Sequence, residues 1–236
     1  MTKDERVKID LHENSIASTA FEGSLEEDLA DQYEEFLYQV QPYLKRYRAA
    51  MKEMRVRFEI LDDSFEDANN RNPIHHIESR LKKPYSIFEK LGRYGIPRTI
   101  EQMEENIFDV AGVRIIVSYL DDVYTLLNML QKQDDLAIIQ LKDYIVNPKP
   151  NGYRSLHFIC RIPIFFRDEQ VNVPVEVQIR TIAMDLWASL EHGLRYKTTV
   201  KLDEQDDIDV AEELRACSDI IEDVEGRMQR LMHAQR

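Results

Sequence analysis

The sequence predicts one mixed α and β domain with helical additions, and three observations support this prediction. With 236 residues the chain is long enough to bury one large core. Residues 173–180 alternate apolar and polar side chains, which is the period of a half-buried β-strand. Residues 25–61 instead repeat apolar side chains at the spacing of an amphipathic helix. We therefore expect strands and helices to share a single core.

The N-terminal quarter predicts an arm followed by a long helical segment. Residues 1–24 are polar and show no sustained period, so we expect a mobile N-terminal arm. Ser24 is a candidate N-cap, and a helical apolar stripe runs from Leu25 to about Leu61. Pro42 lies inside this stripe and is expected to kink or divide the helix, because proline lacks a backbone N–H.

The next segment predicts a strand, a turn and a helix that are rich in cations. Ile74–Lys82 changes to a period of two and predicts a short strand, and Pro84 suits the first turn of a following helix. Free amides at a helix N-terminus attract phosphates, and nearby cations add to this attraction. Four polar residues surround this turn: Arg80, Lys82, Ser86 and Lys90.

A loop and the best strand signal of the chain follow. Asn106–Gly112 is predicted to be a loop that carries Asp109 into a strand at Val113–Tyr119. Arg114 lies on this strand. Two aspartates then predict the start of a helix whose apolar stripe ends at Leu130.

Three more predicted strands and a loop bring further polar residues. The strands are expected at residues 136–145, 158–166 and 171–180. The loop Asn147–Ser155 is indicated by its prolines and its Asn-Gly pair. These segments carry Lys142, Lys149, Asn151, Tyr153, Arg154, His157, Glu176, Gln178 and Arg180.

Two helices are predicted at the C-terminal end. Residues 182–197 are expected to turn Leu186, Trp187, Leu190 and Leu194 toward the core. After an acidic stretch, which we interpret as a solvated linker, a final helix begins near residue 210. Its apolar residues form a heptad seam, which either packs on its own domain or meets another subunit. We favour the second alternative and expect a homo-oligomer. The seam consists of Val210, Leu214, Cys217, Ile221, Val224, Met228 and Leu231.

Composition excludes several classes of function. The formal net charge of −13 argues against a broad basic surface for duplex nucleic acid. Only two cysteines are present, so neither a disulfide framework nor a zinc cluster is expected, and a reducing cytoplasm is indicated. No signal peptide and no apolar run of about 20 residues is found, so we expect a soluble cytoplasmic protein without a membrane partner.

Two acids and a group of cations suggest chemistry on phosphates. Asp109 and Glu176 lie at predicted strand edges, and carboxylates that hold Mg²⁺ among lysines and arginines form sites for phosphoryl or nucleotidyl transfer. No Walker A glycine loop is present. The alternative is that each acid only pairs with a nearby base on a solvated surface. For any single residue we prefer this alternative to a catalytic role. The combination of all these residues favours a site.

Five motifs resemble the synthetase domain of the RelA/SpoT family, and their order and spacing also match. The similarity is close over residues 72–197 and points to the single-domain small alarmone synthetases, with stretches typical of the RelP type. The motifs are Ser79–Lys82 with Ser86 and Lys90, Asp109–Arg114, Lys142–Tyr144, Lys149–His157 and Glu176–Thr181.

This resemblance implies an α+β fold, a nucleotidyltransferase-like mixed β-sheet flanked by helices, with N-terminal and C-terminal helical extensions. It divides the chain into an arm at 1–24, a (p)ppGpp synthetase domain at 25–200 and an oligomerisation helix at 201–236. The implied activity is that of a GTP diphosphokinase, which transfers pyrophosphate from ATP to the ribose 3′ hydroxyl of GDP or GTP. The product is the alarmone (p)ppGpp of the bacterial stringent response. A homotetramer is implied as well.

The resemblance also implies roles for the donor side and the catalytic centre. Arg80 and Arg114 are expected to sandwich the adenine of ATP, since a guanidinium plane stacks well on a base. Asp109 is expected to bind Mg²⁺ and Glu176 to act as metal ligand or general base near the acceptor hydroxyl. The ATP phosphates are assigned to Lys82, Ser86 and Lys90.

On the acceptor side the resemblance implies that Tyr153 stacks on guanine and that Asn151 lies near the guanine edge. Without the motif, the residues alone predict that Tyr153 is an ordinary loop aromatic and that His157 is a strand histidine bonded to backbone. The acceptor phosphates and ribose are assigned to Lys142, Lys149, Arg154 and His157, with Gln178 and Arg180 supporting the centre.

Other functions remain as alternatives. The acceptor could instead be an adenine nucleotide or a tRNA 3′ end, although the acidic charge disfavours RNA. The chain could also be a non-catalytic nucleotide-binding or RNA-binding regulator, but the presence of both Asp109 and Glu176 disfavours a pure binder. Long family members carry a hydrolase domain with a His-Asp pair. This dipeptide does not occur here, so we expect synthesis without hydrolysis.

Overall fold

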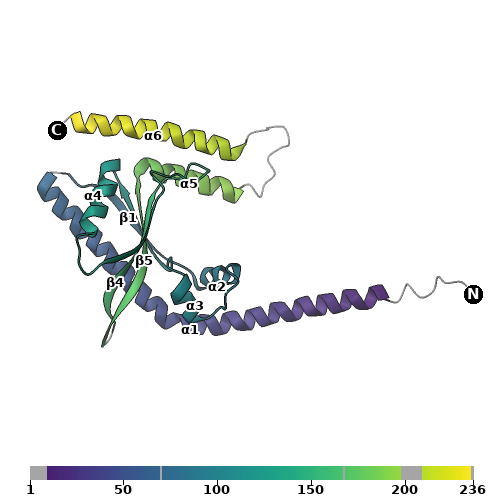
Figure 1. Cartoon of the computed structure of the whole chain (residues 1–236). Helices are drawn as coiled ribbons and strands as arrows, with labels where there is room; N and C mark the ends of the chain where they lie inside the picture. The colour runs from purple at the N-terminus through teal and green to yellow at the C-terminus, as the bar shows by residue number, and fades with distance from the viewer. Residues whose placement is uncertain (1–9, 70, 167, 198–208, 235–236) are drawn as a thin grey trace, which may run out of the picture. The chain divides into compact units, whose positions relative to one another are not determined.

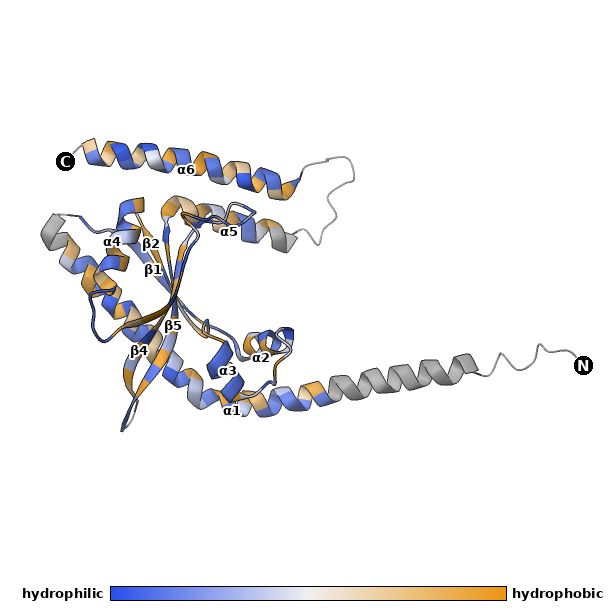
Figure 2. Cartoon of the chain, in the orientation of Figure 1, coloured by the Kyte–Doolittle hydropathy of each residue, from blue (hydrophilic) through white to orange (hydrophobic). Residues whose placement is uncertain are grey.

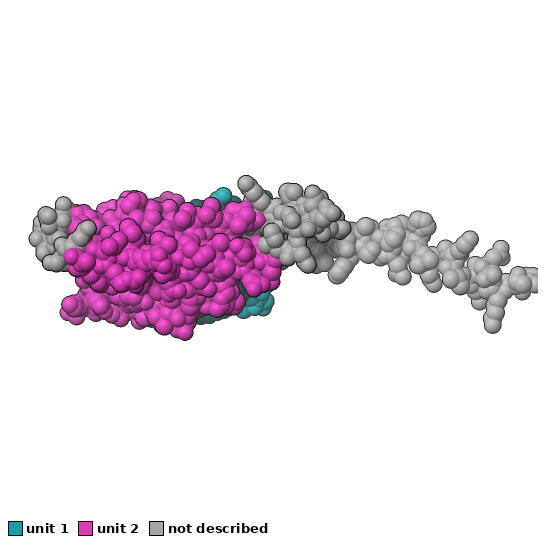
Figure 3. Space-filling model, turned by 90° about the horizontal axis from the view of Figure 1, so that it is seen from above, with its two compact units in different colours: residues 1–43, 83–107 teal, residues 44–82, 108–236 magenta. Residues whose placement is uncertain are grey.

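The computed structural model describes residues 10–69, 71–166, 168–197 and 209–234 (Figure 1). Within these described residues, six helices and five strands follow one another in the order α1, β1, α2, α3, β2, α4, β3, β4, β5, α5 and α6. The chain divides into two compact units (Figure 3). Residues 1–43 and 83–107 belong to the first unit, and residues 44–82 and 108–236 to the second.

The first unit is helical. It contains the N-terminal part of α1 (Asp10–Asn69), then α2 (Pro84–Arg93) and α3 (Ile100–Asn106). Aromatic rings join α1 to α2, because Phe88 lies edge-on to Tyr33 at a centroid distance of 5.3 Å. The short helix α3 was not predicted from the sequence. Its N-cap Thr99 accepts a hydrogen bond from the backbone N–H of Gln102, so the Thr-x-x-Gln pattern was the available signal.

Helix α1 differs from its prediction in two ways. It begins at Asp10 and not at Leu25, so residues 10–24 are helical where an arm was expected, while residues 1–9 lie outside the described residues. It also continues through Pro42 without being divided. Proline inside a helix costs about 3 kcal/mol. Complete burial of residues such as Val40, Met54 and Phe58 along the same helix offsets that cost.

The second unit is built on a five-stranded sheet with the order β1-β2-β5-β4-β3. Strands β2 and β5 are parallel, whereas the other neighbouring pairs are antiparallel. This mixed sheet with helices confirms the predicted fold class. The strands are β1 (Ile74–Leu81), β2 (Ala111–Val117), β3 (Ala137–Asp143), β4 (Leu156–Phe166) and β5 (Glu169–Thr181).

One face of the central strands forms the core of this unit. Val113, Ile115 and Val117 alternate along β2 and are almost completely buried, as are the matching valines of β5. Helix α4 (Leu120–Leu130) adds a buried stripe of leucines and a valine. Figure 2 shows the resulting hydrophobic colouring along the strands. Because side chains alternate across a strand, the polar residues between these apolar ones share the other face.

Helix α5 (Ile182–Lys197) corrects another expectation. Its buried side contains Met184 and Trp187, but Leu186 and Leu190 are 54% and 60% exposed. The predicted core stripe therefore faces outward, except for the tryptophan. The reason is that α5 buries only the side with Met184 and Trp187, and Trp187 also contacts α6 through the Leu214 carbonyl.

Helix α6 (Val210–Ala234) packs on the same unit, and the indole N–H of Trp187 donates to the Leu214 carbonyl at 2.8 Å. Leu214, Ser218 and Ile221 face the domain, whereas Val224 and Met228 are more than half exposed. Only part of the predicted seam is thus available to another subunit. Within the described ranges, no helix combines the length and apolarity needed to cross a membrane.

Candidate active site

A row of polar residues crosses the sheet on the face opposite the core. Strand pairing places Glu78 of β1 opposite Arg114 of β2, which lies opposite Gln178 of β5. The row continues to His157 of β4 and Lys142 of β3. Side chains at paired positions lie about 5 Å apart and point to the same face. Five segments that are distant in sequence therefore place one polar residue each along a single line.

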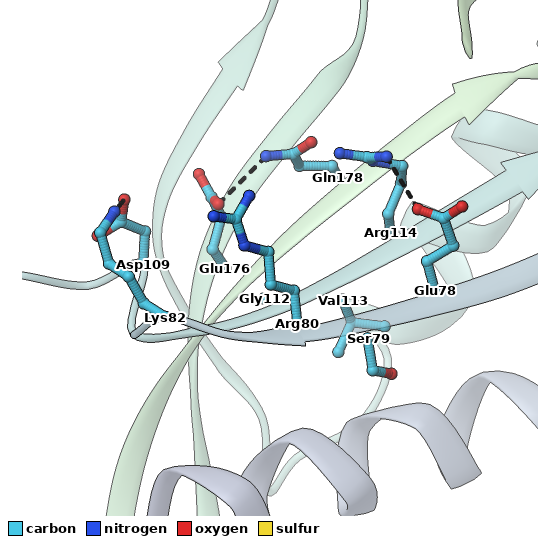
Figure 4. A pocket seen from close by; sticks show the side chains of 10 residues that line it. All are labelled: Glu78, Ser79, Arg80, Lys82, Asp109, Gly112, Val113, Arg114, Glu176 and Gln178. Atoms are coloured by element: carbon cyan, nitrogen blue, oxygen red, sulfur yellow. Dashed lines mark hydrogen bonds and ion pairs between the residues drawn. The ribbon is translucent and has the colours of Figure 1, made fainter. Parts of the chain in front are cut away.

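A second row lies directly beside the first. Arg80 of β1 is opposite Gly112 of β2, and Gly112 is opposite Glu176 of β5. A Cβ at Gly112 would lie 3.5 Å from the Arg80 carbonyl oxygen. Because glycine has no side chain, the space between Arg80 and Glu176 stays open. Figure 4 shows Arg80, Glu176 and Gln178 on the same side of the strands.

The parts of these two rows that lie on β1, β2 and β5 line a pocket of about 530 Å³. It brings together six of the residues that the sequence singled out, five for donor binding, metal binding or catalysis and one, Gln178, for the acceptor side. They are Arg80, Lys82, Asp109, Arg114, Glu176 and Gln178. Its size suits part of a nucleotide and its lining is strongly polar, which favours a charged ligand.

Asp109 meets Lys82 at one end of the pocket. The Lys82 Nζ donates to the Asp109 Oδ2 at 2.7 Å (Figure 4). The backbone holds this arrangement, because the N–H of Lys82 donates to the Val110 carbonyl at 2.8 Å. Strand β1 thus ends directly against the loop that carries Asp109. A carboxylate and an ammonium in this arrangement provide one group for a cation and one for a phosphate oxygen.

Glu176 belongs to a chain of hydrogen bonds on the other side. Gln178 Nε2 donates to Glu176 Oε2 at 3.1 Å, and Arg180 Nη2 donates to Gln178 Oε1 at 2.9 Å. Arg180 also donates to the Tyr153 hydroxyl at 2.7 Å, and that hydroxyl lies 2.7 Å from His157 Nε2. The other ring nitrogen of His157 is 3.8 Å from Glu176 Oε1. The five side chains form a closed ring of contacts that holds the glutamate.

Burial and charge keep His157 neutral. Burial lowers its pKa to about 3, and the cations Arg180, Lys149 and Lys142 act in the same direction. Burial also raises the pKa of the Tyr153 hydroxyl, although Arg180 opposes this effect. At neutral pH the ring therefore combines one glutamate with one arginine and three uncharged groups.

Tyr153 is surrounded by cations and rings. The Lys149 Nζ is 4.7 Å and the Arg180 Cζ is 5.2 Å from its ring centroid. His157 and Trp187 meet the same ring edge-on. The tyrosine is therefore part of a packed cluster, which corrects its interpretation as an ordinary loop aromatic.

The structure does not bring every predicted residue to the pocket. Arg154 turns toward α6, where it pairs with Glu222 at 2.6 Å and with Asp219 at 3.3 Å. Asn151 donates to Glu191 of α5 at 3.2 Å. Ser86 and Lys90 lie on α2 in the first unit and so belong to a different compact unit from the pocket.

Glu78 is a pocket residue that the sequence argument did not select. It lines the pocket and accepts a hydrogen bond from Arg114 Nη1 at 2.9 Å (Figure 4). The available signal was the period of two, because Glu78 shares a strand face with Arg80 and Lys82. A carboxylate beside Arg114 fixes the plane of its guanidinium.

The donor set of the pocket fits a magnesium ion that is shared with a substrate. Mg²⁺ is bound by one or two carboxylates together with phosphate oxygens, and Asp109 and Glu176 line the same pocket. Among the residues that the structure describes, no cluster of three or more His, Cys, Asp or Glu is arranged to hold a metal. The chemistry thus favours a cation completed by substrate over one held by protein alone.

Comparison with known proteins gives consistent results. Residues 79–201 match the family described as "Region found in RelA / SpoT proteins". The chain is 41% identical over 182 residues to GTP pyrophosphokinase YwaC of Bacillus subtilis, covering 77% of this chain and 85% of the relative. It is 35% identical over 164 residues to GTP pyrophosphokinase YjbM of the same species, covering 69% and 76%.

Solved structures agree with these sequence matches. The small alarmone synthetase 1 of B. subtilis bound to its product pppGpp has a TM-score of 0.73 and 31% identity, covering 83% of this chain and 97% of that chain. The small alarmone synthetase 2 of B. subtilis has a TM-score of 0.71 and 39% identity, covering 82% and 98%. Each of these two likenesses extends over more than four fifths of this chain.

Proposed function

The chain belongs to the RelA/SpoT family, and from this premise we infer that it is a GTP pyrophosphokinase. It transfers the β,γ-pyrophosphate of ATP to the ribose 3′ hydroxyl of GDP or GTP and makes the alarmone (p)ppGpp. The observation that carries this inference is the position of Asp109 and Glu176 in one pocket with Arg80, Lys82 and Arg114. Two acids and three cations in one pocket provide the groups that pyrophosphate transfer needs.

The donor binds on the β1–β2 side in this proposal. Arg80 and Arg114 stack on the adenine, and Glu78 keeps the Arg114 guanidinium in place. Lys82 turns from Asp109 to the phosphates of ATP. Asp109 and Glu176 would hold Mg²⁺, which would supply charge neutralisation on the transferred group.

Glu176 removes the proton from the acceptor hydroxyl. The 3′ oxygen attacks the β-phosphorus, the bond from that phosphorus to the oxygen bridging to the α-phosphorus breaks, and AMP leaves. Gln178 bonds one glutamate oxygen and His157 lies near the other, so the ring of contacts orients the base. Arg180 anchors Gln178 and thereby supports the base indirectly.

The acceptor binds on the β4–β5 side. A guanine that stacks on Tyr153 must displace one of the two cations beside that ring, and Lys149 on its loop is free to turn toward the acceptor phosphates. Lys142 lies next to His157 across the strand pair and extends this basic edge. Asn151 reads the guanine edge after it releases Glu191. Arg154 reaches phosphate only if it leaves its two acids on α6.

Incubation of the purified protein with labelled ATP and one candidate acceptor at a time tests this function. The acceptors are GDP, GTP, GMP, ATP and tRNA, each with and without Mg²⁺. We expect labelled guanosine pentaphosphate from GTP and labelled guanosine tetraphosphate from GDP. No other acceptor should be labelled, and both products should require Mg²⁺. A new labelled product from an adenine nucleotide acceptor, or label on tRNA, identifies a different acceptor. Nucleotide binding without transfer to any acceptor identifies a regulator.

We also propose that the protein is a homo-oligomer, and by family resemblance a homotetramer, in the cytoplasm. Exposed apolar side chains on two helices support an oligomer, because single chains rarely leave such residues in water. They include Leu186 and Leu190 of α5, and Val224, Met228 and Leu231 of α6. Figure 2 shows hydrophobic residues recurring between polar ones along α6. Two free cysteines, Cys160 and Cys217, suit a reducing compartment.

A further inference from the structure

The loop that carries Tyr153 is docked on helix α6 through the residue before it. Gly152 has a φ of +88°, a region that favours glycine. A Cβ on Gly152 would lie 2.8 Å from the Cβ of Ser218 and 3.1 Å from the Cα of Arg215. The loop backbone thus approaches the α6 backbone more closely than any residue with a side chain allows.

A buried hydrogen bond holds this approach. The Ser218 hydroxyl donates to the Gly152 carbonyl oxygen at 2.6 Å, and Ser218 is only 4% exposed. In this part of α6 the residues facing the domain are otherwise apolar, such as Leu214 and Ile221. A serine at this position fits because its hydroxyl supplies the partner that a buried carbonyl needs.

Two further contacts join α6 to the same loop region. The Arg154 side chain, next to Tyr153 in the chain, is held by Asp219 and Glu222 of α6. Trp187 packs edge-on against Tyr153 with a centroid distance of 6.3 Å and donates to the Leu214 carbonyl of α6. Residues on both sides of Tyr153, and one ring beside it, are therefore bonded to α6.

We propose that Ser218 is a positioning residue for the guanine nucleotide: its hydrogen bond to Gly152 sets the loop so that Tyr153 presents its ring to the acceptor. This inference rests on the proposed function, because it assumes that Tyr153 binds guanine. The donor pocket on β1 and β2 does not include α6. Loss of the Ser218 hydroxyl therefore weakens acceptor binding and leaves ATP binding unchanged.

The test is the steady-state kinetics of Ser218→Ala. Loss of one buried hydrogen bond is expected to raise the KM for GDP and GTP about three- to tenfold. The KM for ATP and the kcat at saturating acceptor should remain within about twofold of wild type. Binding of GDP measured by calorimetry without ATP should weaken by the same factor as the KM.

The matched control is Cys217→Ala, which removes one heavy atom from the neighbouring, exposed position. It should leave all three kinetic constants unchanged, and light scattering should give the same molar mass for both variants and wild type. An unchanged KM for GDP in Ser218→Ala overturns the inference, as does an equal loss for ATP and GDP. If the wild-type protein makes no product, the proposed function fails instead, so the two failures are distinguishable.

Discussion

The two sides of the active-site region are built differently. On the β1–β2 side, solvent reaches the pair of Arg114 with Glu78, and the side chains of these two residues are 35% and 52% exposed. On the β4–β5 side, Arg180 is only 7% exposed and is joined in one network to Gln178, Tyr153 and Asp185. Exposed pairs exchange partners at little cost, whereas breaking a buried network leaves polar groups unsatisfied. The pairs on the β1–β2 side can therefore rearrange at little cost, while the network around Arg180 is preorganised.

The largest expected effect is on Glu176, which lies where the two sides meet. Glu176→Gln keeps the size of the side chain but removes the base, so transfer should fall by about two to four orders of magnitude. Nucleotide binding should remain close to wild type. Single-turnover transfer and calorimetric binding measure the two quantities. Glu59→Gln, in an exposed pair with Arg55 on α1, is the control and should retain full activity; unchanged turnover in Glu176→Gln would exclude the role as base.

Asp109→Asn tests the open side. The amide is a weak magnesium ligand, so we expect activity to fall about 100-fold and the Mg²⁺ concentration for half-maximal rate to rise. Stability should change by less than about 1 kcal/mol, because the pair with Lys82 is partly solvated. Rates across a magnesium titration and urea unfolding give both values. A normal magnesium dependence would show that Asp109 does not hold the cation.

The two arginines near Asp185 provide a matched comparison of the two sides. Arg180 Nη1 lies 3.1 Å from Asp185 Oδ1, and Arg114 Nη1 lies 3.9 Å from the same oxygen. Arg180→Met should lower the free energy of unfolding by about 3 kcal/mol, because it breaks a buried network. Arg114→Met should lower it by less than about 1 kcal/mol. Equal losses in urea unfolding would contradict the distinction between an open and a preorganised side.

The buried histidine predicts a pH dependence on the acceptor side. The pKa of His157 is lowered to about 3 in the folded protein, whereas an unfolded histidine titrates near about 6.5. Between these values the unfolded chain binds more protons than the folded chain. The free energy of unfolding therefore decreases as the pH falls from about 6.5 toward about 3. The slope is at most about 1.4 kcal/mol per pH unit. Urea unfolding at pH 5 and pH 7 should show a smaller difference for His157→Gln than for wild type.

The smallest effect on the stability of the subunit is expected for the exposed side of α6, which contains Val224 and Met228. Val224→Asp with Met228→Asp should dissociate an oligomer and change the stability of the isolated subunit little, because both residues are exposed. Asp at Leu214 and Ile221 instead disturbs the face that packs on its own domain. Light scattering of both pairs distinguishes the two faces. An unchanged molar mass for the outer pair would place the subunit contact elsewhere.

Several features could be predicted because they depend on neighbours in sequence. The strand that contains Glu176 and the strand that contains Arg114 followed from alternation, and both are found within two residues of their expected bounds. The turn before α2 followed from Pro84. The residue types of the site also followed, since acids and cations at strand edges indicate phosphate chemistry whatever the packing.

Other features depend on the tertiary structure alone. No local pattern states which residue of β1 lies opposite Arg114, and strand register alone places Glu78 there. A helix pattern also leaves open which side is buried. Leu186 was expected inside and is exposed, and Leu214 was expected at another subunit and faces its own domain. Arg154 was expected at the acceptor, but the acids of α6 hold it.

The sequence by itself thus determined most of the secondary structure, the chemical character of the site and the family, because period, composition and motif spacing are properties of short segments. The tertiary structure decided which residues meet, namely the row from Glu78 to Lys142, the ring around Glu176 and the contact of Ser218 with Gly152. The row alone brings together Glu78 and Gln178, which are 100 positions apart in the sequence. Such meetings depend on strand register and helix packing. Both arise only when the whole chain buries its core.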